Sequence, residues 1–405
     1  MTERPVVVIG SSLAGLSAVE TLREAGYEGL LTLVGEEPHQ PYDRPPLSKQ
    51  LLLGTWEAAE TALRPDGHLS RLGVEMHLGR RAVALDPAAR TVTLDDGTPL
   101  AYAGAVIATG ARPRRIPGVP DRDGVHVLRS LDDALALRTA LVARPRVVVA
   151  GAGFIGLEVA AAARAVGCEV TVLEPLRAPL TRVLGPVAGG RFAALHAERG
   201  VRVECGVGVS GVRGAGRVEE VRLTDGRLVA ADVLVVGAGV APNTEWLDSS
   251  GLPVGDGVRC DVYCASGAAG VYAAGDVARW PNPLFGEEMR VEHWTNAVEQ
   301  GRGAARNLIA ELRGRPGERR PFAPVPSFWS DQWGEKIQFA GRAAAEGRTA
   351  VVLDEPDRRR FALAYARGGT LRGALVVNAP RVMAVLRRLL AAGASLDDAV
   401  AAVRT

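Results

Sequence analysis

The stretch over residues 146–174 constrains the fold of this chain more than any other. Residues 147–150 form an unbroken apolar run, which is typical of a strand buried on both faces of a parallel sheet. Glycines follow at positions 151, 153 and 156, and then helix-forming residues and a second apolar run that ends on an acid. The stretch therefore predicts a complete unit of strand, turn, helix and strand.

The glycine spacing favours a bound dinucleotide. In such a unit the three glycines permit a tight turn, the close approach of a pyrophosphate, and close packing of helix on strand. The helix N-terminus offers free N–H groups to the phosphates. The alternative is a turn of the same composition without a ligand. The predicted NAD-binding residues are Gly151, Gly153, Phe154, Ile155, Gly156, Glu174 and Gly239.

Glu174 predicts which nicotinamide nucleotide binds. A carboxylate at the end of the second strand accepts a hydrogen bond from the 2′-hydroxyl of NAD and repels a 2′-phosphate. NADH is therefore expected over NADPH, although Arg177 and Arg182 follow closely enough to soften that preference.

The N-terminal residues repeat the pattern. An apolar run over residues 6–9 precedes the glycine loop, a helix, and a strand that leads to Glu36. Ser12 replaces the middle glycine, but its side chain is small and can donate a hydrogen bond to a phosphate. We predict a second dinucleotide site here. Its loop residues are Gly10, Ser12, Leu13, Ala14 and Gly15.

Two dinucleotide sites in one chain suggest a relay, in which one dinucleotide donates a hydride and the other, held permanently, accepts it. FAD is the common acceptor that carries the same adenosine diphosphate group. Residues 105–108 and 232–236 are expected to be the closing strands of the two halves. Another strand leads to Asp276, which would lie at the carboxyl edge of a sheet, where ligands of open parallel sheets bind.

The expected fold class is α/β, with two Rossmann-like dinucleotide-binding domains, the second inserted in the first, and a C-terminal α+β domain. A linker rich in Arg, Pro and Gly precedes that last domain. The predicted bounds are 1–112 and 238–320 for the FAD-binding domain, 113–237 for the NAD-binding domain, and 321–405 for the C-terminal interface domain.

Composition argues against several other classes. The net charge of +2 and the apolar content of 47% indicate neither disorder nor a dedicated nucleic-acid surface. The chain enters its first strand by Val6, which leaves no room for a signal peptide, and no apolar stretch calls for a membrane span. The four cysteines show no metal-type spacing, so a reduced cytoplasmic protein without a metal site is expected.

Several motifs together resemble the oxygenase-coupled, FAD-dependent NADH:ferredoxin reductases of the putidaredoxin reductase type. These proteins have the pyridine nucleotide-disulfide oxidoreductase fold and are related to apoptosis-inducing factor. The motifs lie in the same order along nearly the whole chain. They are residues 42–49, 110–111, 129–134, 153–158, 275–276, 296–300 and 328–332.

The resemblance implies tightly bound FAD, NADH as donor, and a [2Fe–2S] ferredoxin that serves a haem-thiolate monooxygenase or a Rieske dioxygenase. It implies that Lys49, one of only two lysines, lies near the flavin N5 edge and pairs with Glu158 as the catalytic residues. Glu36 would hold the adenosine ribose, Arg129 the pyrophosphate and Asp276 the ribityl chain. Further FAD contacts would be Arg44, Pro45, Ala82, Ala108, Thr109, Gly110, Gly275, Glu292, His293, Trp294 and Trp329.

Two other functions remain open at this point. The flavoprotein could reduce rubredoxin, a quinone or oxygen, or it could be a redox-switched interaction protein like apoptosis-inducing factor. Thiol chemistry is disfavoured, because the first half of the chain up to Val166 has no cysteine. A basic patch is expected to dock an acidic ferredoxin, unless the arginines concerned form only a solvated surface. The candidates are Arg80, Arg81, Arg112, Arg114 and Arg115, or Arg358 to Arg360. We expect a monomer or a weak homodimer.

Overall fold

The computed structural model describes residues 5–343 and 347–404, so the first four residues of the predicted FAD-binding domain and a few of the C-terminal domain lie outside it. The described chain forms two compact units. Of the described residues, unit 1 comprises 5–43, 62–112 and 241–326. Unit 2 comprises 44–61, 113–240, 327–343 and 347–404.

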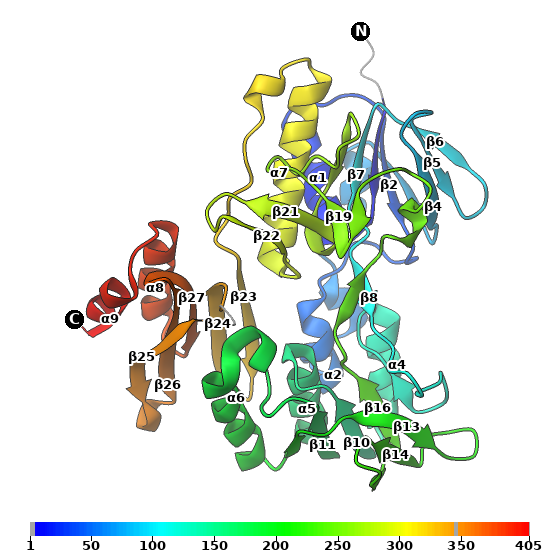
Figure 1. Cartoon of the computed structure of the whole chain (residues 1–405). Helices are drawn as coiled ribbons and strands as arrows, with labels where there is room; N and C mark the ends of the chain where they lie inside the picture. Colours follow the sequence, from blue (N-terminus) through cyan, green and yellow to red (C-terminus); the bar gives the residue numbers. More distant parts are fainter. Residues whose placement is uncertain (1–4, 344–346, 405) are drawn as a thin grey trace. The chain divides into compact units, whose positions relative to one another are not determined.

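Unit 1 is built on a five-stranded parallel sheet in the order β20-β7-β1-β2-β3. Its central strands are fully buried apolar runs, as a sheet covered on both faces requires. Helices α1 and α7 pack together against this sheet (Figure 1). The bounds are β1 Val6–Ile9, α1 Leu13–Glu24, β2 Leu31–Gly35, α3 His68–Arg71, β3 Val74–Leu78, β7 Gly104–Ile107, β20 Val271–Ala273 and α7 Trp294–Leu312.

Two small sheets complete unit 1. One is an antiparallel sheet in the order β4-β5-β6, and the other has the order β18-β19-β21-β22. The bounds are β4 Ala82–Asp86, β5 Thr91–Leu94, β6 Pro99–Ala101, β18 Val254–Gly255, β19 Gly257–Arg259, β21 Ala278–Asn282 and β22 Glu287–Arg290. Short 3-10 turns lie at η3 Glu245–Leu247, η4 Gly275–Val277 and η5 Pro316–Glu318.

Unit 2 contains a second parallel sheet, in the order β12-β11-β10-β16-β9. A three-stranded antiparallel sheet, β13-β14-β15, lies between β12 and β16 in the chain. The bounds are β9 Val125–His126, α4 Leu131–Leu141, β10 Arg146–Ala150, α5 Phe154–Ala165, β11 Glu169–Glu174, α6 Thr181–Glu198, β12 Arg202–Cys205, β13 Val209–Arg213, β14 Glu220–Leu223, β15 Leu228–Ala230 and β16 Val233–Val236. The segment taken from the first half of the chain holds η1 Pro45–Ser48, α2 Gln50–Leu53 and η2 Ala58–Thr61.

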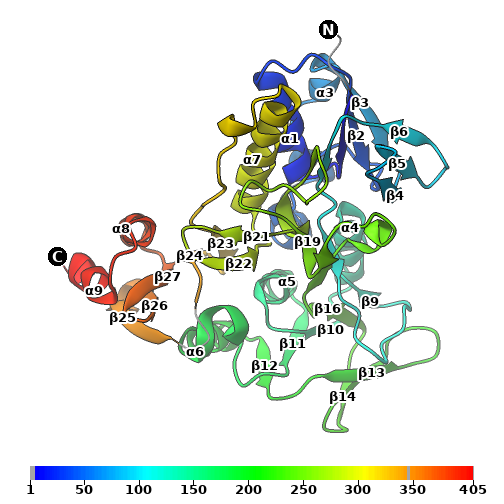
Figure 2. The ribbon, with the colours of Figure 1, turned by 45° about the horizontal axis from the view of Figure 1, so that its top comes forward.

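The C-terminal part of unit 2 is an antiparallel sheet in the order β23-β24-β27-β26-β25, with α8 and α9 packed on it (Figure 2). The bounds are β23 Ser327–Gln332, β24 Glu335–Gly341, β25 Arg348–Glu355, η6 Pro356–Arg358, β26 Arg360–Arg367, β27 Thr370–Val377, α8 Pro380–Ala391 and α9 Leu396–Arg404. The chain passes between the units within β8 Ala111–Pro113 and β17 Val240–Pro242, which pair as a two-stranded sheet.

The predicted mixture of two parallel sheets and a C-terminal α+β part is confirmed. Both predicted strand–turn–helix–strand units are present, and their strands pair in parallel as expected. The sequence did not predict α4, α6 or the β18-β19-β21-β22 sheet.

Candidate functional site

The carboxyl edge of the parallel sheet brings several predicted residues of unit 1 together. Strands β1, β2, β7 and β20 run in the same direction, so the residues that follow each strand meet at one edge. These are the glycine loop after β1, Glu36 after β2, Ala108 to Gly110 after β7, and Gly275 with Asp276 after β20. This is the edge at which open α/β sheets bind ligands.

The outer glycines of the first loop are required by the fold itself. Gly10 has φ +120°, and a Cβ there would overlap the carbonyl oxygen of Ala108. A Cβ at Gly15 would overlap the carbonyl oxygen of Gly10, so the helix could not pack so closely on the strand. Ser12 is the N-cap of α1, with Leu13 and Ala14 forming the first turn. Since α1 begins directly after β1, its N-terminus lies at the carboxyl edge of the sheet, where a helix end can bind a phosphate.

Glu36 stands at the end of β2, where the resemblance implies a contact with the adenosine ribose. Its side chain is 67% exposed and approaches Arg81, with 4.0 Å between Oε1 and Nη1. Ala82, the next residue, begins β4 and is buried.

Gly275 and Asp276 form the turn η4 directly after the sheet. The N–H of Gly275 donates to Oε1 of Gln300, which lies on α7. A Cβ on Gly275 would lie only 3.0 Å from the Cβ of Ala14, so η4 packs directly against the first turn of α1. Asp276 is thereby held beside the predicted phosphate loop.

Thr109 and Gly110 are tied to Asn243. The Thr109 hydroxyl donates to the Asn243 carbonyl oxygen at 2.9 Å, and Asn243 Nδ2 donates back to the Thr109 carbonyl oxygen at 2.9 Å. The Asn243 N–H donates to the carbonyl oxygen of Gly110. These bonds fix the backbone just beyond β7.

The residues that lead into α7 also have defined partners. Glu292 forms an ion pair with Arg290, 2.6 Å between Oε1 and Nη1, and His293 is the N-cap of the helix. Trp294 donates from Nε1 to Oδ1 of Asp43 at 2.7 Å. The indole ring therefore has a fixed orientation, which its sequence position did not predict.

The glycine loop of unit 2 differs from the first in one informative position. A Cβ at Gly151 would overlap the carbonyl oxygen of Gly237, and one at Gly156 would overlap that of Gly151. At Gly153 a Cβ would meet no protein atom within 4 Å, and its backbone angles of −75° and 176° suit any residue. The fold therefore does not require a glycine at position 153, and its lack of a side chain leaves space in front of the α5 N-terminus.

Glu174 is buried, with 8% of its surface exposed, and its carboxylate is fixed by backbone groups. Oε2 accepts a hydrogen bond from the N–H of Ala152 in the glycine loop at 2.8 Å, and Oε1 accepts one from Leu176 at 3.0 Å. Each carboxylate oxygen can accept about two hydrogen bonds, so these two backbone contacts do not exhaust its capacity as an acceptor. Ile155, in the same loop, is half exposed, and Gly239 follows β16 at the same sheet edge.

Lys49, which is half-buried, forms an ion pair with the buried Glu158, with 2.7 Å between Nζ and Oε2. Lys49 also donates to the carbonyl oxygen of Pro45 at 3.0 Å and to the Ser48 hydroxyl at 3.3 Å. Glu158 accepts from the hydroxyls of Ser48 and Ser330. The pair that the resemblance implies is thus present, and its two serine donors are contacts that no spacing in the sequence indicated.

Arg129 precedes α4, whose N-terminus is closed by a capping box between Ser130 and Asp133. The Arg129 N–H donates to the same Asp133 carboxylate at 3.0 Å, and its carbonyl oxygen accepts from Arg44. Trp329 lies on β23 with 36% of its surface exposed. Its neighbour Phe328 stacks edge-on against Phe154, with ring centroids 4.7 Å apart.

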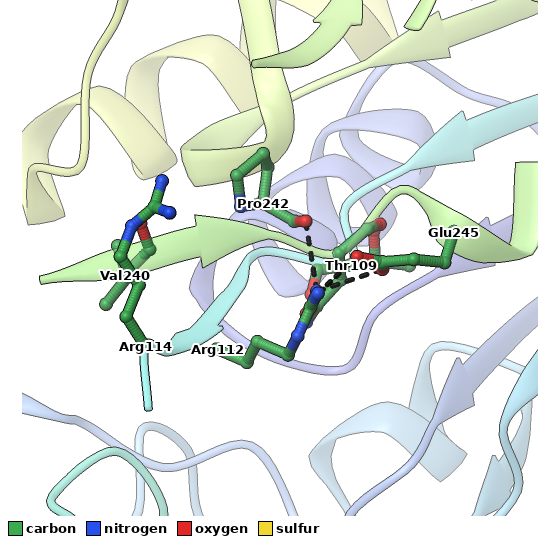
Figure 3. Close-up of polar contacts among 7 residues, drawn as sticks. Thr109, Arg112, Arg114, Val240, Pro242 and Glu245 are labelled. Atoms are coloured by element: carbon green, nitrogen blue, oxygen red, sulfur yellow. Dashed lines mark hydrogen bonds and ion pairs between the residues drawn. The ribbon is translucent and has the colours of Figure 1, made fainter. Parts of the chain in front are cut away.

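The candidate docking arginines other than Arg114 are paired with nearby acids. Figure 3 shows Arg112 pointing toward Glu245 and the Pro242 carbonyl oxygen, and Arg114 donating to Val240. Other pairs are Arg80–Asp96, Arg81–Glu36, Arg115–Asp121, Arg358–Glu355, Arg359–Glu335 and Arg360–Glu355. Local pairing therefore leaves each cluster with less positive charge than the sequence suggests.

The four cysteines are free thiols. Burial raises the pKa of Cys264 to about 12, and burial also raises the pKa of Cys168 and Cys260. Desolvation, aided by the Glu174 carboxylate, raises the pKa of Cys205. A raised pKa disfavours the thiolate, which is the reactive form of cysteine.

Within residues 5–343 and 347–404, no helix combines the length and the apolar content that a membrane crossing needs. No group of three or more His, Cys, Asp or Glu side chains in this described part is arranged to hold a metal ion.

Comparison with known proteins gives a consistent result. Residues 4–301 match the pyridine nucleotide-disulphide oxidoreductase family, and residues 327–404 match the reductase C-terminal family. The chain is 39% identical over 399 residues to the ferredoxin–NAD(+) reductase component of the anthranilate 1,2-dioxygenase system of Burkholderia cepacia, covering 98% of this chain and 96% of the relative. It is 40% identical over 389 residues to rhodocoxin reductase of Rhodococcus erythropolis, covering 95% and 89%.

A solved structure shares this fold over the full length. The covalent putidaredoxin reductase–putidaredoxin complex matches with a TM-score of 0.92 at 30% identity, covering 100% of both chains.

Proposed function

Since the chain belongs to the pyridine nucleotide-disulphide oxidoreductase family, we propose that it is an FAD-dependent NADH:ferredoxin oxidoreductase that supplies an oxygenase. The predicted family and fold are confirmed, and family membership supports FAD and NADH as its cofactors. The observation that carries the proposal is that both parallel sheets end in a glycine loop, a helix N-terminus and an acid. The bound flavin would supply the step from a two-electron hydride donor to a one-electron acceptor.

The residues of unit 1 fit the adenosine diphosphate part of FAD. The α1 N-terminus provides N–H donors for the phosphates, with Gly10 and Gly15 holding the loop closed. Glu36 would bind the adenosine ribose, and Asp276 would bind the ribityl chain. The predicted domain bounds of 1–112 with 238–320, 113–237 and 321–405 are part of this proposal.

The residues of unit 2 fit NADH. Gly153 leaves the α5 N-terminus open to a pyrophosphate, and the prearranged Glu174 carboxylate is suited to accept from ribose hydroxyls. Its negative charge opposes a 2′-phosphate, which supports NADH over NADPH. Lys49 and Glu158 are the proposed catalytic pair, since a fixed ammonium group stabilises negative charge on a reduced acceptor.

The printed names of the relatives favour a ferredoxin as electron acceptor and an oxygenase as the enzyme that it supplies. We propose that an arginine cluster docks this ferredoxin, and that the protein works in the cytoplasm as a monomer or a weak homodimer. No observation in the structure favours rubredoxin, a quinone or a signalling role.

The test is anaerobic mixing of the purified protein with NADH and a [2Fe–2S] ferredoxin, followed by the loss of ferredoxin absorbance. A parallel reaction with NADPH is the control. Fast reduction with NADH alone, slowed by salt, is expected. If NADH reduces the flavin while the ferredoxin stays oxidised, the proposed acceptor is wrong, and quinone, rubredoxin and oxygen are tested in its place.

A further inference from the structure

A series of hydrogen-bonded polar side chains in unit 2 leads to Oε1 of Glu158, the carboxylate oxygen that is not paired with Lys49. Trp333 Nε1 lies 3.4 Å from His196 Nδ1, and His196 Nε2 lies 2.9 Å from Gln332 Oε1. Gln332 Nε2 lies 3.0 Å from the Ser330 hydroxyl, which lies 2.5 Å from Glu158 Oε1. His196, Gln332 and Ser330 are at most 1% exposed. The helix α6, the strand β23 and the turn residue Trp333 directly after β23 thus contribute a continuous series of hydrogen bonds.

The direction of every hydrogen bond in this chain is set by its first donor. An indole N–H can only donate, so His196 Nδ1 must accept and the imidazole proton must sit on Nε2. Nε2–H then donates to the Gln332 carbonyl oxygen, which leaves the amide nitrogen to donate to Ser330. The Ser330 hydroxyl in turn donates its own proton to Glu158. All donors therefore point toward the carboxylate.

Burial agrees with this assignment, because it lowers the pKa of His196 and favours the neutral ring that the chain requires.

The other oxygen of Glu158 is held in the same way. Oε2 accepts from the Ser48 hydroxyl and from the Lys49 ammonium group. The three N–H groups of the Lys49 ammonium donate to Pro45, Ser48 and Glu158. Its effect on a neighbouring group is therefore that of a fixed charge whose position depends on Glu158.

We propose that Trp333, His196 and Gln332 are positioning residues, which hold Glu158 as a correctly placed carboxylate and thereby fix the Lys49 ammonium group. This inference rests on the proposed function, in which Lys49 stabilises the reduced flavin. None of the three residues needs to touch the cofactor.

A purely structural role would not need this arrangement. A buried polar series is costly unless every member is satisfied, and an apolar core of the same shape is often at least as stable. Here every member of the series has a hydrogen-bond partner, and all the donors point in one direction. The series ends at Glu158, which forms the ion pair with Lys49. We therefore infer that this series of hydrogen bonds serves to position the Glu158 carboxylate.

The first test reads the direction of the chain without using activity. In the holoenzyme, the imidazole ¹⁵N shifts of His196, assigned with His196→Asn, are expected to show a neutral ring protonated on Nε2. Trp333→Phe keeps the ring contact but removes the donor, and it should produce a mixture of the two tautomers. A charged ring or the Nδ1-protonated form in the unsubstituted protein would overturn the proposal.

The second test measures the flavin midpoint potential by spectroelectrochemistry. Gln332→Met keeps the side-chain length but breaks both hydrogen bonds, so Lys49 is less well fixed and reduced flavin is less stabilised. We expect at least a tenfold change toward oxidised flavin at a fixed potential, which is about 30 mV for a two-electron couple. Gln338→Met, on the neighbouring strand β24 and outside the chain, is the matched control and should not change the potential.

A Gln332→Met potential equal to that of the control, or a higher one, would refute the positioning role. A protein that binds no flavin would refute the proposed function and remove the target of the chain. The two failures are therefore distinguished by the colour of the purified protein.

Discussion

Substituting Gly153 with alanine separates the needs of a ligand from the needs of the fold. At this position the backbone angles suit alanine, and the added Cβ meets no protein atom within 4 Å. The change removes freedom from the unfolded chain, which contributes about 0.4–1 kcal/mol of stability, but Gly153 is the N-cap of α5, where alanine is less favourable than glycine, and this offsets the gain. The stability of the fold is therefore expected to change little, with a melting temperature within about 1 °C of the unsubstituted protein.

NADH binding, in contrast, is expected to weaken clearly. A methyl group in front of the α5 N-terminus keeps the pyrophosphate away from the backbone N–H donors. Losing one hydrogen bond to a charged group costs about 1.5–3 kcal/mol, which corresponds to about a 10- to 100-fold weaker affinity. Stability and affinity thus diverge, which misfolding cannot imitate.

The assay is the NADH dependence of flavin reduction in a stopped-flow instrument, together with a thermal melt of the same sample. The apparent Kd should rise in Gly153→Ala while the limiting rate changes much less, because the lost contact is present before and during hydride transfer. Gly156→Ala is the control, since its Cβ overlaps the Gly151 carbonyl oxygen and should destabilise the fold. Unchanged NADH affinity in a folded Gly153→Ala protein would refute the assignment of the loop to NADH.

Three further substitutions test other parts of the structure. Glu174→Gln should weaken the binding of NADH about tenfold or more, because the amide nitrogen would place a donor against a backbone N–H. It should also reduce the preference for NADH over NADPH, because a neutral amide no longer repels a 2′-phosphate. Steady-state kinetics with both nucleotides would measure the two effects. Asp232→Asn should lower the free energy of unfolding by about 1 kcal/mol at neutral pH, because the ion pair with Arg146 lowers the pKa of Asp232 from 3.8 to about 2. Denaturant melts should show this difference above pH 4 and its loss as the pH falls toward 2. Burial lowers the pKa of His196, so below about pH 6.5 the unfolded state binds more protons than the folded state. The free energy of unfolding should therefore fall as the pH decreases, by at most about 1.4 kcal/mol per pH unit. His196→Gln should remove this contribution to the pH dependence, as melts at several pH values would show.

The sequence predicted the elements whose signal is local. The runs at β1 and β10 are buried strands because apolar residues without interruption fit only a sheet covered on both faces. The helix α6 was missed because Gly185 and Pro186 lie inside it and are usually helix breakers. In the structure Gly185 has the non-helical angles φ 76° and ψ 171°, so α6 consists of two helical segments that meet at a kink there.

The candidate site could be predicted only where a motif carries its own geometry. The outer glycines are fixed by contacts within a few residues or with the adjacent strand, so their spacing was informative. The partners of Glu158 were not accessible in this way, since Ser48 and Ser330 lie 110 and 172 residues from it in the chain. Hydroxyl groups are common, and nothing in their spacing shows which ones will face a buried carboxylate.

The two glycine loops differ most in how their acids are prepared, and this difference bears on how long each nucleotide stays. Glu174 is buried and already held by two backbone N–H groups, so a ribose can bind without ordering the side chain. Glu36 is largely exposed and must lose rotamer freedom when it binds, at a cost of up to about 2 kcal/mol. A ligand that exchanges in every turnover would have to order this side chain at each binding event, whereas a permanently held cofactor orders it once. We infer that the prearranged acid serves the exchanging NADH and the mobile acid serves the resident FAD.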